Sequence, residues 1–186
     1  SPIDGISFCI PTNGARPQKI KLTINSIMKE MAGYPYEIII AGDTDNLDNL
    51  QNVILINKKE EAKSRKVSLL RNVSAENSSF DTIVWCDDDI IIGEKWRENI
   101  YRFSQESGWS VLGCKIYNPD GTRHWDRKIH GPNTHQLVSY DHPSYDKNLM
   151  QTSGFMMVRK EVFNNVKWDE ECLVYADRLD NSAYGR

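Results

Sequence analysis

The sequence predicts an α/β fold, a single Rossmann-like domain with a mostly parallel central sheet. Short apolar runs rich in β-branched residues alternate with longer segments whose apolar residues recur at helical spacing. The segments follow the order β-α-β-β-α-β-α, which implies right-handed crossovers between parallel strands. The length of 186 residues fits one domain with a substantial core.

The first βα unit is read from residues 6–33. Residues 6–10 form an apolar run that predicts a strand, and the turn-forming residues 11–17 end it. From residue 18 the apolar side chains recur at helical spacing until Gly33, so we expect a helix that packs on the sheet.

Two more strands and a second helix are predicted next. Residues 37–41 form a strand whose carboxyl end carries an acid, Asp43, and residues 53–56 form the third strand. Residues 60–78 contain neither glycine nor proline, and their apolar residues lie on one side of a helix. We therefore expect one uninterrupted helix over residues 60–78.

Three adjacent acids, Asp87, Asp88 and Asp89, directly follow the fourth predicted strand at residues 82–86. In an open α/β sheet the carboxyl ends of strands face the ligand-binding crevice, and neighbouring carboxylates there repel one another unless a cation neutralises them. Hard oxygen ligands suit Mg²⁺ or Mn²⁺, which leave coordination positions for water and substrate phosphates. Alternate residues of an extended segment point the same way, so we expect Asp87 and Asp89 to bind the metal. A solvated loop or a helix N-cap is the alternative interpretation.

The second part of the chain is less regular. A helix is predicted near residues 94–105, a strand over residues 109–117, and a turn at residues 118–121. The next stretch is rich in His, Pro, Asn and Tyr and is a candidate substrate-facing loop, in which Trp125 either stacks on a sugar ring or packs in the core. Residues 150–158 are apolar around a Ser-Gly pair. The four histidines, taken singly, are expected to be surface residues: His124, His130, His135 and His142.

Charge and composition exclude some classes of protein. A net charge of −3 gives no general attraction to DNA or RNA, so we expect no nucleic-acid partner. No apolar run approaches the roughly 20 residues of a transmembrane helix, and the first residues do not form a signal peptide, so we expect a soluble cytoplasmic protein. The four cysteines show no C-x-x-C spacing and are expected to be free thiols: Cys9, Cys86, Cys114 and Cys172.

These motifs together resemble the nucleotide-sugar glycosyltransferases of the A-type fold, particularly the family-two-like inverting enzymes with one compact catalytic domain. The resemblance spans nearly the whole chain, and Arg71-Asn72 stands at the family's usual spacing before the Asp-x-Asp motif. The remaining matching motifs are the opening Pro-Thr, the acid after the second strand, the glycine strand and the aromatic-Asp-Glu: Pro11-Thr12, Asp43, Ser153-Gly154 and Trp168-Asp169-Glu170.

The resemblance implies a nucleotide-binding half at residues 1–108 and an acceptor-side half at residues 109–186, a point past which relatives often continue. It implies a nucleotide-diphosphate sugar as donor, with a UDP-sugar preferred, a saccharide or other hydroxyl acceptor, and Mn²⁺ or Mg²⁺ as cofactor. The metal is assigned to Asp87 and Asp89. The nucleotide-sugar contacts are assigned to Pro11, Thr12, Asn13, Arg16, Asp43, Arg71, Asp87 and Asp88.

The chain departs from the family pattern near its C-terminus. Where relatives carry a Glu-Asp pair whose Asp acts as general base, this chain has Ala176-Asp177, with Asp180 displaced from the second acidic position. We assign Asp177 as the base, since an inverting displacement needs a carboxylate on the acceptor side. Glu170 and Glu171 are rivals for this role, and an N-cap role for Asp177 stays open.

The function that we expect is metal-dependent, inverting transfer of a sugar from a nucleotide-diphosphate donor to an acceptor hydroxyl. A sugar nucleotidyltransferase is the first alternative, but it would show a glycine-rich phosphate loop after the first strand, which residues 13–16 barely resemble. A non-catalytic nucleotide- or carbohydrate-binding domain on the same scaffold is the second, because fold does not fix function.

Overall fold

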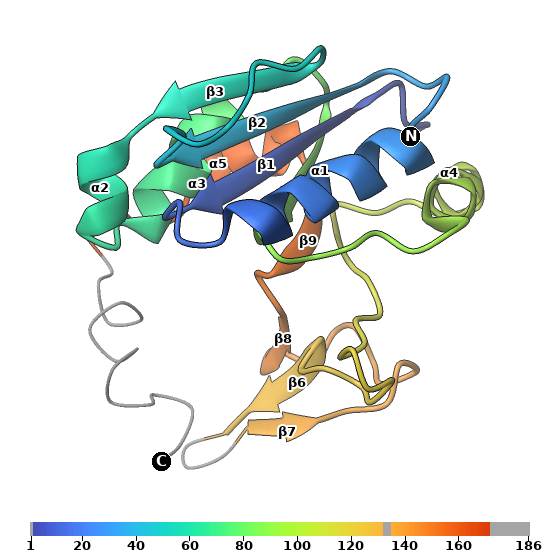
Figure 1. Ribbon diagram of the computed structural model, residues 1–186. Helices are drawn as coiled ribbons and strands as arrows, with labels where there is room; N and C mark the ends of the chain where they lie inside the picture. Colours follow the sequence, from blue (N-terminus) through green and yellow to red (C-terminus); the bar gives the residue numbers. More distant parts are fainter. Residues whose placement is uncertain (1, 132–134, 172–186) are drawn as a thin grey trace.

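A six-stranded sheet in the order β3-β2-β1-β4-β9-β5 is the centre of the computed structural model (Figure 1). Strands β1 to β4 are parallel, and β9 pairs antiparallel with β4 and β5. The structure describes residues 2–131 and 135–171. This sheet confirms the predicted α/β class. Its strands are β1 (Ile6–Thr12), β2 (Tyr36–Gly42), β3 (Val53–Asn57), β4 (Thr82–Cys86), β5 (Val111–Gly113) and β9 (Phe155–Arg159).

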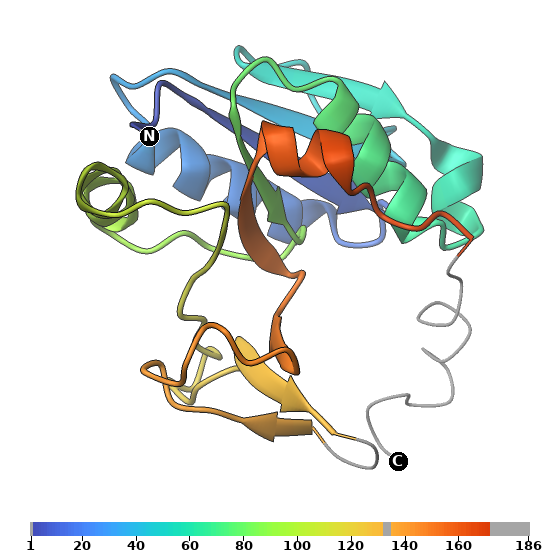
Figure 2. The ribbon, with the colours of Figure 1, turned by 180° about the vertical axis from the view of Figure 1, so that it is seen from behind.

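Helices cover both faces of this sheet. Helices α1 (Pro17–Glu30) and α4 (Trp96–Glu106) lie on the face toward the viewer in Figure 1. Helices α3 (Val67–Glu76) and α5 (Lys160–Asn165) lie on the opposite face, which Figure 2 turns toward the viewer. The short α2 (Lys59–Lys63) follows β3 directly.

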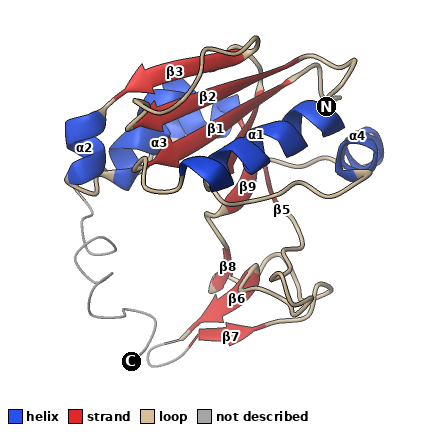
Figure 3. Ribbon diagram, in the orientation of Figure 1, coloured by secondary structure: helices blue, strands red, loops and turns tan. Residues whose placement is uncertain are grey.

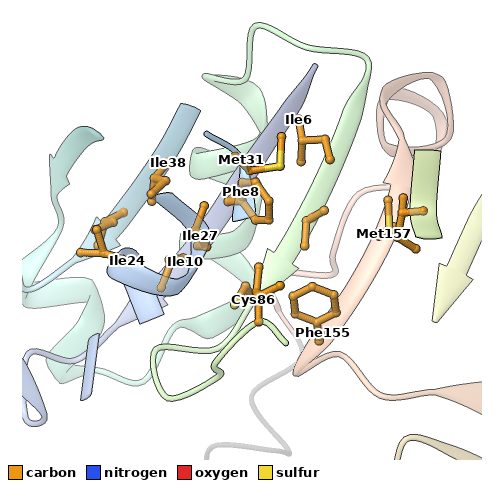
Figure 4. Close-up of a cluster of buried hydrophobic side chains, with 14 of the residues drawn as sticks. Ile6, Phe8, Ile10, Ile24, Ile27, Met31, Ile38, Cys86, Phe155 and Met157 are labelled. Carbon is orange, nitrogen blue, oxygen red and sulfur yellow. The ribbon is translucent and has the colours of Figure 1, made fainter. Parts of the chain in front are cut away.

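The central strands are buried on both faces, as parallel strands between helices are expected to be. In β1, Phe8 and Ile10 pack against the apolar side of α1, in the cluster that Figure 4 shows. Cys9 between them points the other way, into a second cluster with Ala75 of α3 and Phe163 of α5. The period of two along the strand therefore divides its side chains between two layers of the core.

The order of the strands creates a switch point beside β1. The chain runs from β1 to β2 and β3 on one side and then returns to place β4 on the other side. In open α/β sheets a ligand crevice forms at the carboxyl ends of the strands where this reversal occurs. The end of β1 at Thr12 and the acids that follow β4 both lie at this point.

A second, three-stranded antiparallel sheet in the order β7-β6-β8 lies apart from the first, below it in Figure 3. It consists of β6 (Arg127–His130), β7 (His135–Leu137) and β8 (Leu149–Gln151). Residues 152–154 connect β8 to β9, whose first residue, Phe155, pairs with Cys86 at the end of β4. The second sheet is therefore tied to the main sheet beside the switch point.

The prediction of a single helix over residues 60–78 was wrong, because this segment forms two helices, α2 and α3. Arg65, between them, has a left-handed backbone with φ of 56°. Ala62 of α2 and Leu70 of α3 are both buried in one cluster with Ala41 of β2. Packing of two short helices on the end of β2 overrides the helix propensity of the connecting residues.

One expected strand was also wrong in extent, and one apolar run holds two separate strands. The run predicted over residues 109–117 pairs with β9 only at Val111–Gly113. The apolar run at residues 150–158 divides into β8 and β9, which belong to different sheets. The first run leaves the main sheet after Gly113, and the second run passes from the second sheet into the main one, and local pattern encodes neither change.

Three of the cysteines, Cys9, Cys86 and Cys114, are described and are free thiols, as expected. Burial raises the pKa of Cys9 to about 12, so this thiol stays protonated. Cys172 lies outside the described residues. Within residues 2–131 and 135–171, no helix is long and apolar enough to cross a membrane.

The core makes a prediction about stability. Phe8 is fully buried, and its ring centroid lies 5.8 Å from that of Trp96. Phe8→Ala leaves a cavity in the centre of the core, so it should lower the free energy of unfolding in urea by about 3–5 kcal/mol. Phe103→Ala, on the exposed side of α4, is the matched control and should cost less than about 1 kcal/mol. Equal losses for both variants would contradict this packing.

Candidate functional site

A cleft with a volume of about 1300 Å³ opens at the carboxyl ends of β1 and β4. Its other wall comes from residues 116–119, from His124, Trp125 and Lys128, and from the link between β8 and β9. Of the residues predicted to bind the nucleotide or the metal, only Asp43 does not line this cleft. The lining includes all the others: Pro11, Thr12, Asn13, Arg16, Arg71, Asp87, Asp88 and Asp89.

Asp88 is the buried member of the acidic triplet, and the first βα loop holds it. The Thr12 hydroxyl donates to Asp88 Oδ2 at 2.9 Å. Arg16, at the N-terminus of α1, pairs with Asp88 Oδ1 and also donates to Asp89 Oδ2 at 2.8 Å. One guanidinium thus spans two carboxylates from the neighbouring strand, which locks the loop after β1 to the end of β4.

Asp87 is held from the opposite side of the cleft. Its N–H donates to the Gly154 carbonyl oxygen at 2.8 Å, and Arg71 Nη2 of α3 lies 3.6 Å from its Oδ1. Burial raises the pKa of Asp87, the nearby Arg71 opposes this, and the charges of Asp89 and Asp88 add to it. Arg71 and Arg16 therefore lower the pKa of Asp87 by less than its burial and the neighbouring carboxylates raise it.

The donor set suits a hard divalent cation. Asp87 and Asp89 offer carboxylate oxygens, and their side chains are more exposed to the cleft than that of Asp88, at 43% and 35% against 5%. Among residues 2–131 and 135–171, no group of three or more His, Cys, Asp or Glu side chains is arranged to hold a metal. The protein would therefore supply one or two carboxylates and leave the other positions to water and phosphate, as Mg²⁺ sites usually do.

Gly154 keeps space beside this carboxylate. A Cβ atom on Gly154 would lie 3.0 Å from Asp87 Oδ2, tighter than ordinary van der Waals contact. The link between the two sheets thus approaches the acidic triplet closely because it has no side chain at this residue.

Asp43 lies beside the cleft and does not line it. Its N–H donates to the Thr12 carbonyl oxygen at 3.1 Å, and a Cβ atom on Gly14 would lie 2.9 Å from the Cβ of Asp43. Lys59 Nζ is 3.8 Å from Asp43 Oδ2. The loop after β1 and the end of β2 are therefore neighbours, and Gly14 lies against Asp43.

A buried amide joins α3 to the last described segment. The Asn72 side chain donates to the Trp168 carbonyl oxygen at 2.8 Å and to Glu170 Oε1 at 3.0 Å, and it accepts from the Trp168 N–H at 3.0 Å. The Arg71 guanidinium lies over the Trp168 ring, 4.7 Å from its centroid. Two motifs 96 residues apart in sequence are therefore one structural unit.

Sequence reasoning missed most of the second wall of the cleft. Tyr117, Asn118 and Lys128 belong to this wall. Lys19 and Arg65, from the nucleotide-binding half, line the cleft as well. Residues 118–121 were recognised as a turn, but the local pattern did not indicate that Asn118 and Pro119 line the same cleft as the acids.

Not every histidine of the candidate substrate-facing loop reaches the cleft. His124, Trp125 and His135 line the cleft, whereas His130 and His142 are not among its lining residues. Glu170 and Glu171 are also outside the lining. The assigned base, Asp177, lies outside the described residues, as do Ala176 and Asp180.

Comparison with solved structures supports the fold. The crystal structure of S. aureus TarS 1-349 aligns with a TM-score of 0.62 and 17% sequence identity, covering 90% of this chain and 51% of that chain. The crystal structure of S. aureus TarS 1-349 in complex with UDP aligns with a TM-score of 0.57 and 16% identity over the same shares. The chain thus spans about half the length of these proteins. A search of curated proteins finds no match.

The family follows from the sequence match. The sequence model described as Glycosyl transferase family 2 matches residues 7–167, which extend from β1 past β9 and include the acidic triplet and the glycine link. This match confirms the resemblance drawn from the motifs. The chain belongs to glycosyl transferase family 2.

Proposed function

We propose that this chain carries out metal-dependent, inverting transfer of a sugar from a nucleotide-diphosphate donor to an acceptor hydroxyl. The observation that supports this most is the acidic triplet at the switch point, where Arg16 and Arg71 offset its charge only in part. A site with spare negative charge and hard oxygen donors suits a cation that brings a diphosphate with it.

The donor is a nucleotide-diphosphate sugar, and a UDP-sugar is our preferred choice. One of the structures with the same fold was solved in complex with UDP, which supports this nucleotide. The loop at Thr12-Asn13 and the end of β2 at Asp43 would receive the nucleoside. A carboxylate such as Asp43 accepts hydrogen bonds from a base N–H, and loop amides reach ribose or phosphate.

Asp87 and Asp89 would hold the cation, Mn²⁺ or Mg²⁺, which when bound offsets the charge of the diphosphate leaving group. Arg71 and Arg16 keep the carboxylates oriented toward the cleft. Gly154 keeps the space beside Asp87 open, so a phosphate oxygen can approach the same atoms.

In the reaction, the acceptor oxygen attacks the anomeric carbon from the side opposite the diphosphate. The new C–O bond forms as the bond to the diphosphate breaks, and the leaving nucleotide takes the electron pair. The acceptor hydroxyl gives its proton to a carboxylate on the acceptor side, for which we propose Asp177.

The metal role is tested by Asp89→Asn, which removes one charge and keeps the shape of the side chain. This variant should bind UDP more weakly than wild type in the presence of Mn²⁺, because one metal ligand loses its charge, while the fold measured by circular dichroism stays intact. Asp48→Asn, an exposed acid outside the cleft, is the control and should match wild type. Unchanged UDP affinity in Asp89→Asn would remove this residue from the metal site.

The nucleoside site is tested by Asp43→Ala. Loss of a hydrogen bond to a charged group should weaken UDP binding by about 1–3 kcal/mol, measured by calorimetry. Asp45→Ala is the matched control, because Asp45 is exposed and pairs with the same lysine, Lys59. A loss in the control as large as that in Asp43→Ala would mean that Lys59, and not the base contact, is responsible.

The assigned base is tested by Asp177→Asn. Turnover should fall by roughly 10²–10⁴, while the affinities for UDP and Mn²⁺ stay near those of wild type, because the lost contact acts on the acceptor proton. Asp180→Asn should leave turnover close to wild type. Normal turnover in Asp177→Asn would transfer the role to another residue.

A further inference from the structure

The cleft is larger than most binding sites for one small molecule. Binding sites for small molecules usually have volumes of about 300–1,000 Å³. This cleft has about 1300 Å³, and its two walls differ in chemistry. The wall from β1 and β4 carries the acids and arginines, whereas the facing wall carries Tyr117, His124 and Trp125. A second ligand therefore has room opposite the acidic triplet.

Two aromatic rings are exposed on the facing wall. Tyr117 is 59% exposed and Trp125 is 48% exposed, although both line the cleft. The sequence left open whether Trp125 packs in the core, and this exposure places it outside the core. Aromatic rings that lie open in a cleft offer flat apolar faces on which a ligand can stack.

Backbone hydrogen bonds fix this wall in place. The His124 N–H donates to the Ile116 carbonyl oxygen at 2.9 Å, and the Asn118 N–H donates to the Thr122 carbonyl oxygen at 2.8 Å. Tyr117 also forms a β-bridge with Arg123. The two aromatic residues thus belong to two paired segments.

A buried carboxylate anchors these segments from below. Asp126 is 1% exposed and accepts from the Ile116 N–H at 3.0 Å, from Arg123 Nε at 2.9 Å and from the Tyr140 hydroxyl at 2.7 Å. Preorganised walls of this kind spare a ligand the entropy cost of ordering them.

His124, which lies between Tyr117 and Trp125 in the sequence, offers its Nε2 atom as a hydrogen-bond acceptor. Asn118 Nδ2 donates to Thr122 Oγ1 at 3.0 Å, which fixes the orientation of the amide. The atom that lies 3.2 Å from His124 Nδ1 is then Asn118 Oδ1, which can only accept a hydrogen bond. In the neutral imidazole the proton then lies on Nδ1 and Nε2 carries a lone pair. Such an Nε2 atom can accept a hydrogen bond from a ligand hydroxyl.

We propose that Tyr117, His124 and Trp125 form the acceptor subsite of this cleft and that its ligand is a saccharide. A pyranose ring has a face of C–H groups that stacks on aromatic rings and a rim of hydroxyls that needs polar partners. The wall supplies both, because His124, Asn118 and Lys128 lie among the aromatics. A lipid chain would need a continuous apolar surface, which these polar residues interrupt.

This subsite rests on the proposed function and can be tested separately from it. Wild type, Trp125→Ala, Trp125→Phe and Tyr117→Ala are tested with UDP and Mn²⁺ present on an array of immobilised neutral, N-acetylated and acidic oligosaccharides. Tyr145→Ala is the control, since Tyr145 is 88% exposed and lies outside the cleft lining. UDP affinity is measured for every variant, and binding to phosphatidylglycerol vesicles is measured in parallel.

Wild type and Tyr145→Ala should bind the same saccharides, and Trp125→Ala and Tyr117→Ala should bind them about five- to tenfold more weakly, the scale of a lost stacking contact. Trp125→Phe should regain part of the affinity. UDP affinity should be equal in all variants, which separates a lost subsite from a misfolded chain.

If wild type binds UDP, three outcomes would contradict the proposed subsite. The first is that no saccharide binds to wild type, and the second is that Trp125→Ala binds saccharides as wild type does. The third is that Trp125 is needed for binding to vesicles and not to saccharides. Failure of wild type to bind UDP at all would instead contradict the proposed function.

Discussion

Electrostatic repulsion among Asp87, Asp88 and Asp89 at the end of β4 is the constraint on which the cleft depends. Two unit charges about 4 Å apart near a protein surface interact by roughly 4 kcal/mol, so three neighbouring carboxylates need positive partners. Arg16 reaches them from the N-terminus of α1 and Arg71 reaches them from α3. These partners come from elements on both faces of the sheet, so the site exists only when the whole sheet is assembled. Burial raises the pKa of Asp87, and the charges of Asp89 and Asp88 add to this rise, whereas Arg71 and Arg16 oppose it.

The same helix that steadies the acids also holds the far end of the described chain. Arg71 faces Asp87 and stacks on Trp168, and its neighbour Asn72 makes three hydrogen bonds to Trp168 and Glu170. A buried amide with satisfied partners is costly to disrupt, since each buried polar group left unpaired lowers the stability of the fold by about 1–3 kcal/mol. The donor side of the cleft and the segment that leads toward Asp177 are therefore mechanically joined through two consecutive residues of α3.

Much of the donor side could be predicted because strand ends are local features. The apolar run before Asp87 and the turn residues after Ile10 mark the carboxyl ends of β4 and β1, and the rule for open sheets brings such ends together. The break at Arg65 was not predictable, because it arises from the packing of Ala62 and Leu70 on β2. The facing wall with Tyr117 and Trp125 was missed as a wall, because its position depends on the bridge between Tyr117 and Arg123 and on the hydrogen bonds of the buried Asp126.

The central claim is that the acidic triplet binds a nucleotide through a cation. Calorimetry of the wild-type chain with UDP, GDP and CDP, each with Mn²⁺ and with excess chelator, tests it most directly. The account predicts that UDP binds the most tightly of the three and that chelation weakens its binding at least tenfold, equivalent to about 1.4 kcal/mol. Equal UDP affinity with Mn²⁺ and with chelator would contradict the claim and leave Arg16 and Arg71 as the groups that hold the diphosphate.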